Sequence, residues 1–156
     1  MPTAPTPRAV FERLASLLSS GSWTEIAALY AEDAVVDIPF ALPAPDRVEG
    51  RAALHERFST VGARALDITV DNITVHETAD PEVIVAAFDY RGRALTTGRA
   101  FHVTNLQVLR VRDGLIAAST DYHDHVALAV ATGHQPALEE ALGAGGTPFS
   151  LDRASG

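Results

Sequence analysis

The sequence predicts an α+β domain in which helices come first and a curved antiparallel sheet follows. Up to about residue 61 the apolar residues recur at helical spacing, and from residue 66 they alternate with polar residues. The pair Asp113-Gly114 lies between two alternating segments, which is a strong signal for a β-hairpin. A run of helices followed by a run of strands is typical of the α+β class.

Three helices are expected in the first part of the chain. Pro7 is favourable as a first helical residue, Gly21 ends the first helix, and the sequence SWTE from Ser22 to Glu25 forms a capping box that begins the second. A short strand, AVVDIPF, and a proline-rich loop separate the second helix from the third. The predicted helices span residues 7–20, 22–32 and about 51–61.

Long strands joined by short turns are expected in the second part. The alternation changes phase at Asp71-Asn72, which predicts a β-bulge. A bulge curves a sheet, and a curved sheet that holds helices in its concave side leaves a cone-shaped cavity. The sequences ADP (79–81), RGR (91–93) and DG (113–114) predict turns, with strands that end near 90, run from about 95 to 111 and resume at 115.

The domain boundaries follow from the ends of these patterns. Residues 1–6 are expected to be a disordered lead, and residues 7–135 a single domain. After the last strand, one or two helical turns are expected, with Asp124 or His125 near the cap. Residues 136–156 contain little that could pack, so we expect a flexible C-terminal tail.

Composition excludes several classes of protein. The 156 residues include no cysteine, which rules out disulfides, thiolate chemistry and cysteine-ligated metal sites. The net charge of −8 with only 12 Lys and Arg argues against nucleic acid or an anionic membrane as a partner. No apolar run approaches the ~20 residues of a membrane span. Prolines interrupt the N-terminal segment where a secretory signal needs a continuous apolar stretch, so a cytoplasmic location is expected.

Three segments in order, IAALYAEDAVVDIP, VEGRAALHERF and VRDGLIAASTDYHD, resemble the nuclear transport factor 2-like superfamily. Within it the sequence is most similar to the SnoaL-like polyketide cyclases, ketosteroid isomerase and the limonene epoxide hydrolases. The resemblance covers roughly residues 8–130 and implies a ketosteroid isomerase-like α+β barrel with an internal pocket. In SnoaL-like cyclases an aspartate on the last strand serves as the acid–base residue, and Asp121 is at the matching position.

The same resemblance implies that the two other activities are altered. The isomerase's catalytic positions fall on Leu14, Ile38 and Gln107, and its supporting tyrosine on Tyr30. The epoxide hydrolase's two aspartates fall on Asp121 and Asp89, and part of its water-holding pair on Asp37. Its bridging arginine is replaced by Ala87, and the arginines that could substitute are Arg91, Arg93 and Arg99.

The stretch GLIAASTDYHDH carries the candidate catalytic residues. Because side chains alternate along a strand, Ser119, Asp121 and His123 share a face, which the resemblance turns toward the cavity. A carboxylate on an apolar wall can hold or exchange a proton near neutral pH, and His123 lies ~6.5 Å along the strand as a proton partner or orienter. The alternative is that Asp121 is salt-bridged to Arg99 or Arg110.

Other candidate pocket residues come from the neighbouring strands. Asn105 and Gln107 could donate hydrogen bonds to a carbonyl or enolate oxygen. Asp37 and Asp89 are either second pocket carboxylates or exposed strand residues. The candidate substrate-binding residues are Asn105, Gln107, Asp37, Ile38, Phe88, Asp89, Phe101 and Tyr30. Asp121, His123 and His125 share a parity that would suit a metal, but His125 is at the strand's end, so we expect neither a metal nor a cofactor.

These features predict a small-molecule pocket protein. We expect a cofactor-independent acid–base enzyme of the cyclase or isomerase type that acts on an apolar, oxygenated molecule such as a polyketide or terpenoid. The alternatives are a non-catalytic ligand-binding module and an epoxide hydrolase-like enzyme that lacks the usual arginine. A homodimer is also expected, because Thr104, Leu106, Val108 and Arg110 form a mostly apolar outer face of the sheet.

Overall fold

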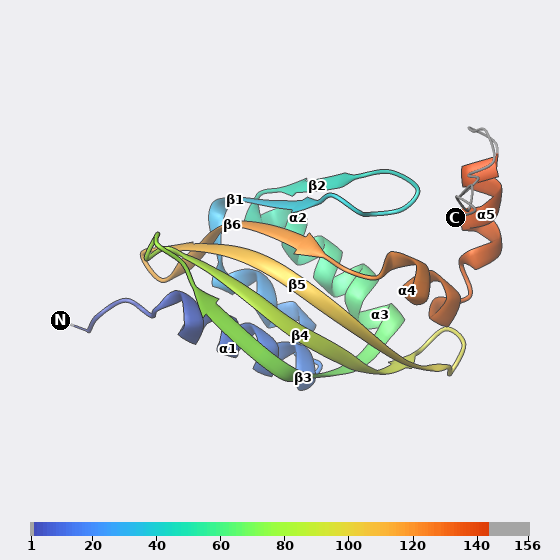
Figure 1. The fold of residues 1–156 in the computed structure, drawn as a ribbon, viewed down its shortest axis with the longest axis horizontal. Helices are drawn as coiled ribbons and strands as arrows, with labels where there is room; N and C mark the ends of the chain where they lie inside the picture. Colours follow the sequence, from blue (N-terminus) through green and yellow to red (C-terminus); the bar gives the residue numbers. More distant parts are fainter. Residues whose placement is uncertain (1, 144–156) are drawn as a thin grey trace, which may run out of the picture.

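A single open sheet of six strands wraps partly around the N-terminal helices (Figure 1). The computed structural model describes residues 2–143. The strands lie in the order β2-β1-β6-β5-β4-β3. All neighbouring pairs are antiparallel except β1 and β6, which run parallel. The α+β class is confirmed, but the sheet is mixed rather than wholly antiparallel.

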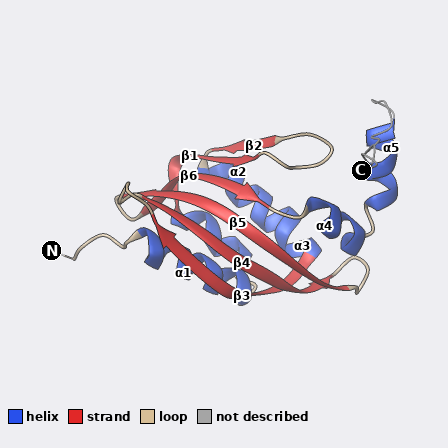
Figure 2. Ribbon diagram, in the orientation of Figure 1, coloured by secondary structure: helices blue, strands red, loops and turns tan. Residues whose placement is uncertain are grey.

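The N-terminal helices lie on the concave side of the sheet (Figure 2). Helix α1 begins at Pro7 as predicted, where the Thr6 hydroxyl accepts from the Ala9 N–H at 3.2 Å. The third predicted helix is a continuous run of three short pieces. The helical elements are α1 (Pro7–Ser19), η1 (Trp23–Leu29), α2 (Arg51–Arg57), η2 (Phe58–Gly62), α3 (Ala63–Ala65), α4 (His125–Thr132) and α5 (Gln135–Gly143).

The second predicted helix is shorter than expected and is a 3₁₀ helix. The capping box does not form, because the Ser22 side chain makes no cap and its hydroxyl lies 2.8 Å from that of Ser20. The chain enters strand β1 at Tyr30, so that Tyr30 is a strand residue rather than a helical one. Every second residue from Ala34 to Ile38 is buried, which is the pattern of a strand with one face on the core and not that of a helix.

The predicted strands are present, but β4 continues to Ala94 rather than ending near residue 90, and β5 begins at Ala100 rather than near residue 95. The bulge at Asp71-Asn72 is confirmed by a register shift and by a φ of 50° at Asn72. The RGR sequence is not a turn but part of strand β4. Its glycine is needed because Gly92 lies so close to the neighbouring strand that a Cβ would meet the Asp67 carbonyl oxygen at 1.9 Å. The strands are β1 (Tyr30–Ile38), β2 (Asp46–Glu49), β3 (Leu66–Glu77), β4 (Val83–Ala94), β5 (Ala100–Arg112) and β6 (Leu115–Tyr122).

The predicted hairpin at Asp113-Gly114 joins β5 to β6. Both residues have positive φ, 52° and 77°, as a two-residue hairpin turn requires. Strand β2 lies within the loop expected from the sequence ALPAPDRVEG, and it was missed because the DRVE segment is polar and proline precedes it.

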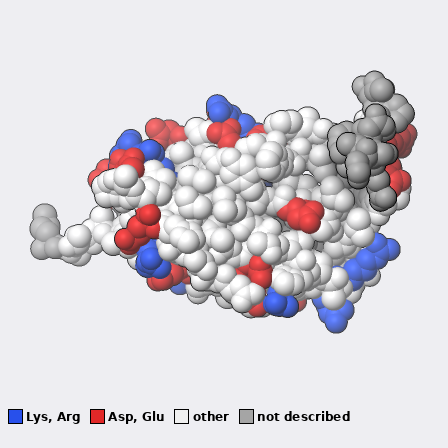
Figure 3. All heavy atoms as spheres, in the orientation of Figure 1, with Lys and Arg blue, Asp and Glu red and all other residues white. Residues whose placement is uncertain are grey.

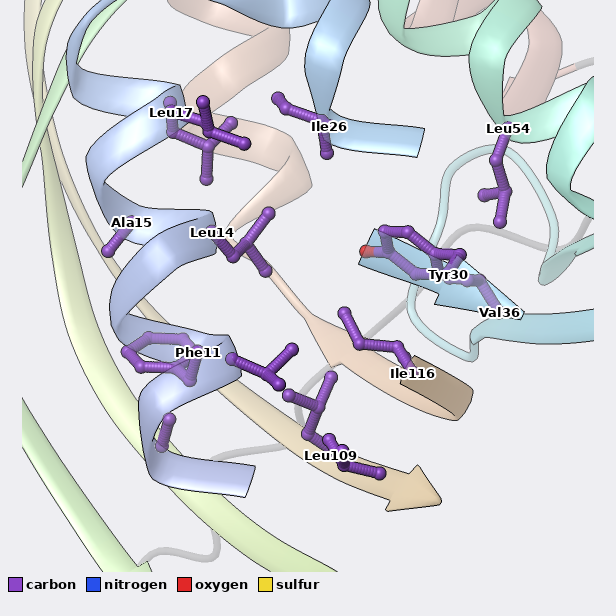
Figure 4. Packing of buried hydrophobic residues seen from close by; sticks show 14 of the residues in the cluster. Phe11, Leu14, Ala15, Leu17, Ile26, Tyr30, Val36, Leu54, Leu109 and Ile116 are labelled. Carbon is purple, nitrogen blue, oxygen red and sulfur yellow. The ribbon is translucent and has the colours of Figure 1, made fainter. Parts of the chain in front are cut away.

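The hydrophobic core fills the space between α1 and the concave face. Helix α1 packs across β3, β4 and β5. Phe11 and Leu14 of α1 meet fully buried residues of the sheet such as Leu109 and Ile116 (Figure 4). On the same face a cavity is lined by α1, η1 and α2 and by the strands β1, β4, β5 and β6.

The C-terminal region begins with α4, which is capped as predicted. The Asp124 carboxylate accepts from the Ala127 N–H at 2.9 Å. Helix α5 occupies residues 135–143 at the start of the expected flexible tail, and none of its residues is buried. The rest of that tail, residues 144–156, lies outside the described residues. Within residues 2–143, no helix has both the length and the apolar character of a membrane span.

Candidate functional site

A mostly apolar cavity of about 140 Å³ lies between the concave face of the sheet and the N-terminal helices. Each of the helices α1, η1 and α2 contributes apolar side chains to its wall, and the sheet contributes both apolar and polar ones. The apolar lining includes Leu14, Trp23, Ile38, Leu54, Phe58 and Phe88. The polar lining consists of Tyr30, Arg57, Tyr90, Gln107, Asp121, His123 and His125.

Asp121 of β6 faces this cavity, as expected from the alternation of the strand combined with the resemblance. Its Oδ1 accepts a hydrogen bond from Gln107 Nε2 at 2.9 Å and another from the Ser119 hydroxyl. Its Oδ2 has no hydrogen-bond partner among the described residues, and it is not one of their fully buried polar atoms. One carboxylate oxygen is therefore fixed, and the other is left for a ligand.

The alternative, in which Asp121 serves only as a salt-bridge partner of Arg99 or Arg110, does not fit the contacts. Arg99 donates to the Val130 carbonyl at 2.7 Å. Arg110 pairs with Asp80 at 3.0 Å and with Glu82 at 3.4 Å, both of which lie just before the first residue of β4. Neither arginine lines the cavity.

His123 lies directly after β6 and is held from three sides. Its Nδ1 lies 2.8 Å from Asn105 Oδ1, its ring stacks on Tyr90 at 5.8 Å, and the ring of His125 meets it edge-on at 5.7 Å. Burial lowers the pKa of His123, and the neighbouring His125 and Arg57 lower it further, whereas Asp121 opposes this shift. The imidazole is therefore neutral at neutral pH.

Two tyrosines on opposite walls complete the polar part of the site. Tyr30 extends from β1 toward helix α1 (Figure 4), and Tyr90 comes from β4. Neither hydroxyl has a hydrogen-bond partner among the described residues. Neither oxygen is fully buried, and both residues line the cavity. Burial and the nearby Asp121 charge raise the pKa of both tyrosines, so both are neutral hydrogen-bond donors at neutral pH.

Tyr90 was not predicted, although the sequence contained the signal. It lies two residues beyond Phe88, so an alternating strand that turns Phe88 inward must also turn Tyr90 inward. The prediction that β4 ends near residue 90 hid this relation, because the last residue of a strand has no defined face.

The other predicted pocket residues divide into three groups. Ile38, Phe88 and Gln107 line the cavity. Asn105 is 2% exposed and lies behind His123, so it contacts the histidine rather than the cavity. Phe101 packs against the core without lining the cavity. The expected hydrogen bond from Asn105 to a ligand is therefore wrong.

Of the two alternatives for Asp37 and Asp89, that of a pocket carboxylate is wrong for both, since they lie on the outer face of the sheet and neither lines the cavity. Asp37 forms a two-point ion pair with Arg47, at 2.7 and 3.2 Å. Alternation explains both errors: Asp37 is next to Ile38, and Asp89 is next to Phe88, so the two members of each pair cannot face the same cavity.

Asp89 instead forms the centre of a hydrogen-bonded cluster on the outer face. Its Oδ2 accepts from Asn72 Nδ2 at 2.6 Å and lies 2.8 Å from His102 Nε2, and its Oδ1 accepts from the Thr104 hydroxyl at 2.8 Å. These hydrogen bonds, first that of Asn72, lower the pKa of Asp89 to about 2. The carboxylate is fully occupied by the protein, so it is a structural group.

A cation does lie at the cavity, but it is not one of the predicted arginines. Arg91 pairs with Asp71 on the outer face, and Arg93 donates to the Gly98 carbonyl. Arg57 of α2 lines the cavity and pairs with Asp46 at 2.7 Å. Among the described residues, no three His, Asp or Glu side chains are arranged to hold a metal ion.

Comparisons with known proteins agree with this fold. Residues 11–119 match the family model of the SnoaL-like domain. An uncharacterised Bacillus subtilis protein, YesE, is 31% identical over 102 residues, which are 65% of this chain and 67% of that protein.

Two solved structures show the same fold at lower identity. A proposed isomerase from Bacillus subtilis is 23% identical with a TM-score of 0.77, over 82% of this chain and 93% of that one. A proposed polyketide cyclase from Pseudomonas putida is 19% identical with a TM-score of 0.71, over 82% and 98%. At these identities the similarity establishes the fold alone.

Proposed function

Because the chain belongs to the family of SnoaL-like domains, we propose that it is a cofactor-independent acid–base enzyme of the cyclase or isomerase type. The observation that carries the proposal is the pairing of a free carboxylate oxygen on Asp121 with a neutral His123 at one apolar cavity. Perturbed titratable groups that converge in a pocket are the usual mark of an active site. We expect the reaction to be a proton transfer beside a carbonyl group.

The proposed reaction assigns the two kinds of polar group different roles. A base at Asp121 or His123 removes a proton from a carbon next to a carbonyl, and the bonding electrons move toward the carbonyl oxygen. Tyr30 and Tyr90 donate hydrogen bonds to the oxygen as its negative charge develops, and they remain protonated because their pKa is raised. In an isomerisation the base returns the proton to another carbon of the substrate. In a ring closure the enolate carbon forms a bond to a second carbonyl carbon of the same molecule, the electrons of that C=O bond move to its oxygen, and the base gives the proton to this oxygen.

The cavity can hold an organic molecule. Its volume of about 140 Å³ is well above the ~10–15 Å³ that a cavity needs to hold a single water. The apolar wall favours a carbon skeleton, and the few polar groups favour one or two oxygens. We therefore propose a compact, apolar, oxygenated substrate, such as a small terpenoid or a single-ring polyketide fragment.

An exchange experiment tests the proposal without knowledge of the natural substrate. Small cyclic ketones and lactones of up to about ten non-hydrogen atoms are incubated with the protein in deuterium oxide, and NMR follows the loss of protons next to the carbonyl. We expect catalysed exchange for at least one probe, at a rate unchanged in the outer-face variant Asp37→Asn. Probes that bind but do not exchange above the background would favour a non-catalytic binding module.

We also propose a homodimer formed through the outer face of the sheet, in the cytoplasm. Thr104 and Leu106 are exposed there, and Figure 3 shows that the charged side chains on this side lie mainly around its edges. The Leu106 side chain, 38% exposed on this face, would be covered in such a dimer. Light scattering at micromolar concentration should give twice the mass of 16.5 kDa. The monomer mass would contradict the proposal.

A further inference from the structure

The contacts of His123 define which of its nitrogens faces the ligand. Asn105 Oδ1, at 2.8 Å from Nδ1, is a carbonyl-type oxygen that can only accept a hydrogen bond. With the Asn105 amide in this orientation, Nδ1 carries the hydrogen, and in a neutral imidazole Nε2 then carries the lone pair. His123 Nε2 has no hydrogen-bond partner among the described residues and is not fully buried. His123 lines the cavity.

We infer that His123 Nε2 accepts the proton from the substrate, and that Asn105 is the positioning residue that selects this tautomer. This inference rests on the proposed proton transfer. In the step, the C–H bond beside the carbonyl breaks, an N–H bond forms at Nε2, and the electron pair becomes the enolate, whose oxygen is held by the tyrosine hydroxyls. The imidazolium later gives a proton back to the enolate, and exchange of its N–H with solvent before that return carries deuterium into the substrate in the exchange assay.

Asp121 serves this step as a charge partner. Its Oδ1 is occupied by Gln107 and Ser119, which fixes the carboxylate beside His123. The Asp121 charge favours the protonated form of His123, whereas burial, His125 and Arg57 disfavour it. The imidazole is thereby neutral at neutral pH, with Nε2 unprotonated. The imidazolium that forms during the reaction has Asp121 as its counterion.

Asn105 is suited to the positioning role by its surroundings. It lies on β5, is 2% exposed, and has no access to the cavity. The stacked Tyr90 ring and the edge of His125 restrict rotation of the imidazole, so the amide oxygen meets Nδ1 and not Nε2. A residue in this place affects the substrate only through the histidine.

The first test is a measurement of the tautomer by NMR on protein labelled with ¹⁵N-histidine. We expect His123 to show a protonated Nδ1 and an unprotonated Nε2 at neutral pH, and Asn105→Leu to lose this preference. Asn105→Asp should keep it, because a carboxylate also accepts from Nδ1–H. Asn72→Leu, which removes an amide from the outer face, is the matched control and should change nothing at His123. A protonated Nε2 in the wild type would overturn the inference.

The second test uses the exchange assay with small ketones. Asn105→Leu should lower the maximal rate at least about tenfold with little change in KM, since the amide does not touch the substrate. Asn105→Asp should recover activity and shift the acidic limb of the pH–rate profile upward, because an added negative charge favours imidazolium. The groups that face His123 are Asp121, His125, Arg57 and Tyr90, and all are unchanged in these variants.

The two tests separate this inference from the proposed function. An unchanged tautomer and pH profile in a folded Asn105→Leu protein would overturn the role of Asn105, even if exchange is catalysed. The expected tautomer without exchange of any probe would overturn the proton transfer, and with it the role of Nε2 as the acceptor. Thermal unfolding of each variant shows whether the protein is folded when it is assayed.

Discussion

The concave and outer faces of the sheet place the same type of side chain in different surroundings. On the concave face Asp121 keeps one oxygen free in an apolar cavity. On the outer face Asp89 uses both oxygens in hydrogen bonds to three neighbours, and Asp37 is paired with Arg47. A carboxylate becomes available for chemistry only where the protein leaves part of it without a partner, and this condition separates the two faces.

The largest expected effect of a substitution is at Asp121. Asp121→Asn keeps the shape but removes the counterion of the His123 imidazolium, so we expect exchange activity to fall by about 10²–10³-fold. The matched change Asp89→Asn on the outer face should leave activity within about twofold. Equal losses in both variants would show that the two faces do not differ in function. Thermal melts of both proteins serve as the control for folding.

Two leucines on β5 allow the contributions of the two faces to the free energy of unfolding to be compared. Leu109 points inward and is 0% exposed, whereas Leu106 points outward and is 38% exposed. Leu109→Ala should lower the free energy of unfolding by about 2–5 kcal/mol, because it leaves a cavity in the core. Leu106→Ala should cost less than about 1 kcal/mol in the monomer. Urea unfolding of the two variants measures the difference.

A smaller effect on activity is expected from Tyr90. Tyr90→Phe removes a hydroxyl from the cavity but keeps the ring that stacks on His123. If the hydroxyl stabilises a developing negative charge, the maximal exchange rate should fall by about 10–100-fold, somewhat less than the ~10²–10³-fold loss typical of an oxyanion-hole donor, because Tyr30 still donates to the same oxygen. Tyr122→Phe, which changes a tyrosine outside the cavity lining, is the control. Equal rates for Tyr90→Phe and the wild type would remove Tyr90 from the mechanism.

The smallest expected effect is the acid sensitivity due to Asp89. Its pKa of about 2 in the folded protein is below the ~3.9 of an unfolded aspartate, so the unfolded chain binds the proton more readily. The stabilisation from this group is present above about pH 4 and is lost as the pH falls toward 2. Asp89→Asn should therefore lower the melting temperature at pH 7 by a few degrees, and this difference from the wild type should shrink in acid.

The sequence was sufficient for the features that depend on local pattern. The bulge at Asn72, the turn at Asp113-Gly114 and the cap at Asp124 each use a residue type with a specific backbone preference, and all three are confirmed. The face of Asp121 followed from alternation combined with the resemblance. These features need no knowledge of which strands are neighbours.

The features that depend on pairing could not be read from the sequence. Gly92 was taken for a turn residue because a glycine between two arginines gives no sign of the strand that passes close to it. Strand β2 has too few apolar residues to show a pattern and exists because it pairs with β1. The contact of Asn105 with His123 joins residues 18 positions apart, and only the register of β5 against β6 brings them together.

The parallel pairing of β1 with β6 has a consequence for the order of folding. Strands β3 to β6 are consecutive and antiparallel, so each hairpin closes a short loop, whereas β1 meets β6 across most of the chain. Closing a longer loop loses more chain entropy, and such contacts form late. The meander can therefore bring Asp121 next to Gln107 before β1 docks, and the arrival of β1 with Tyr30 is the step that closes the wall of the cavity.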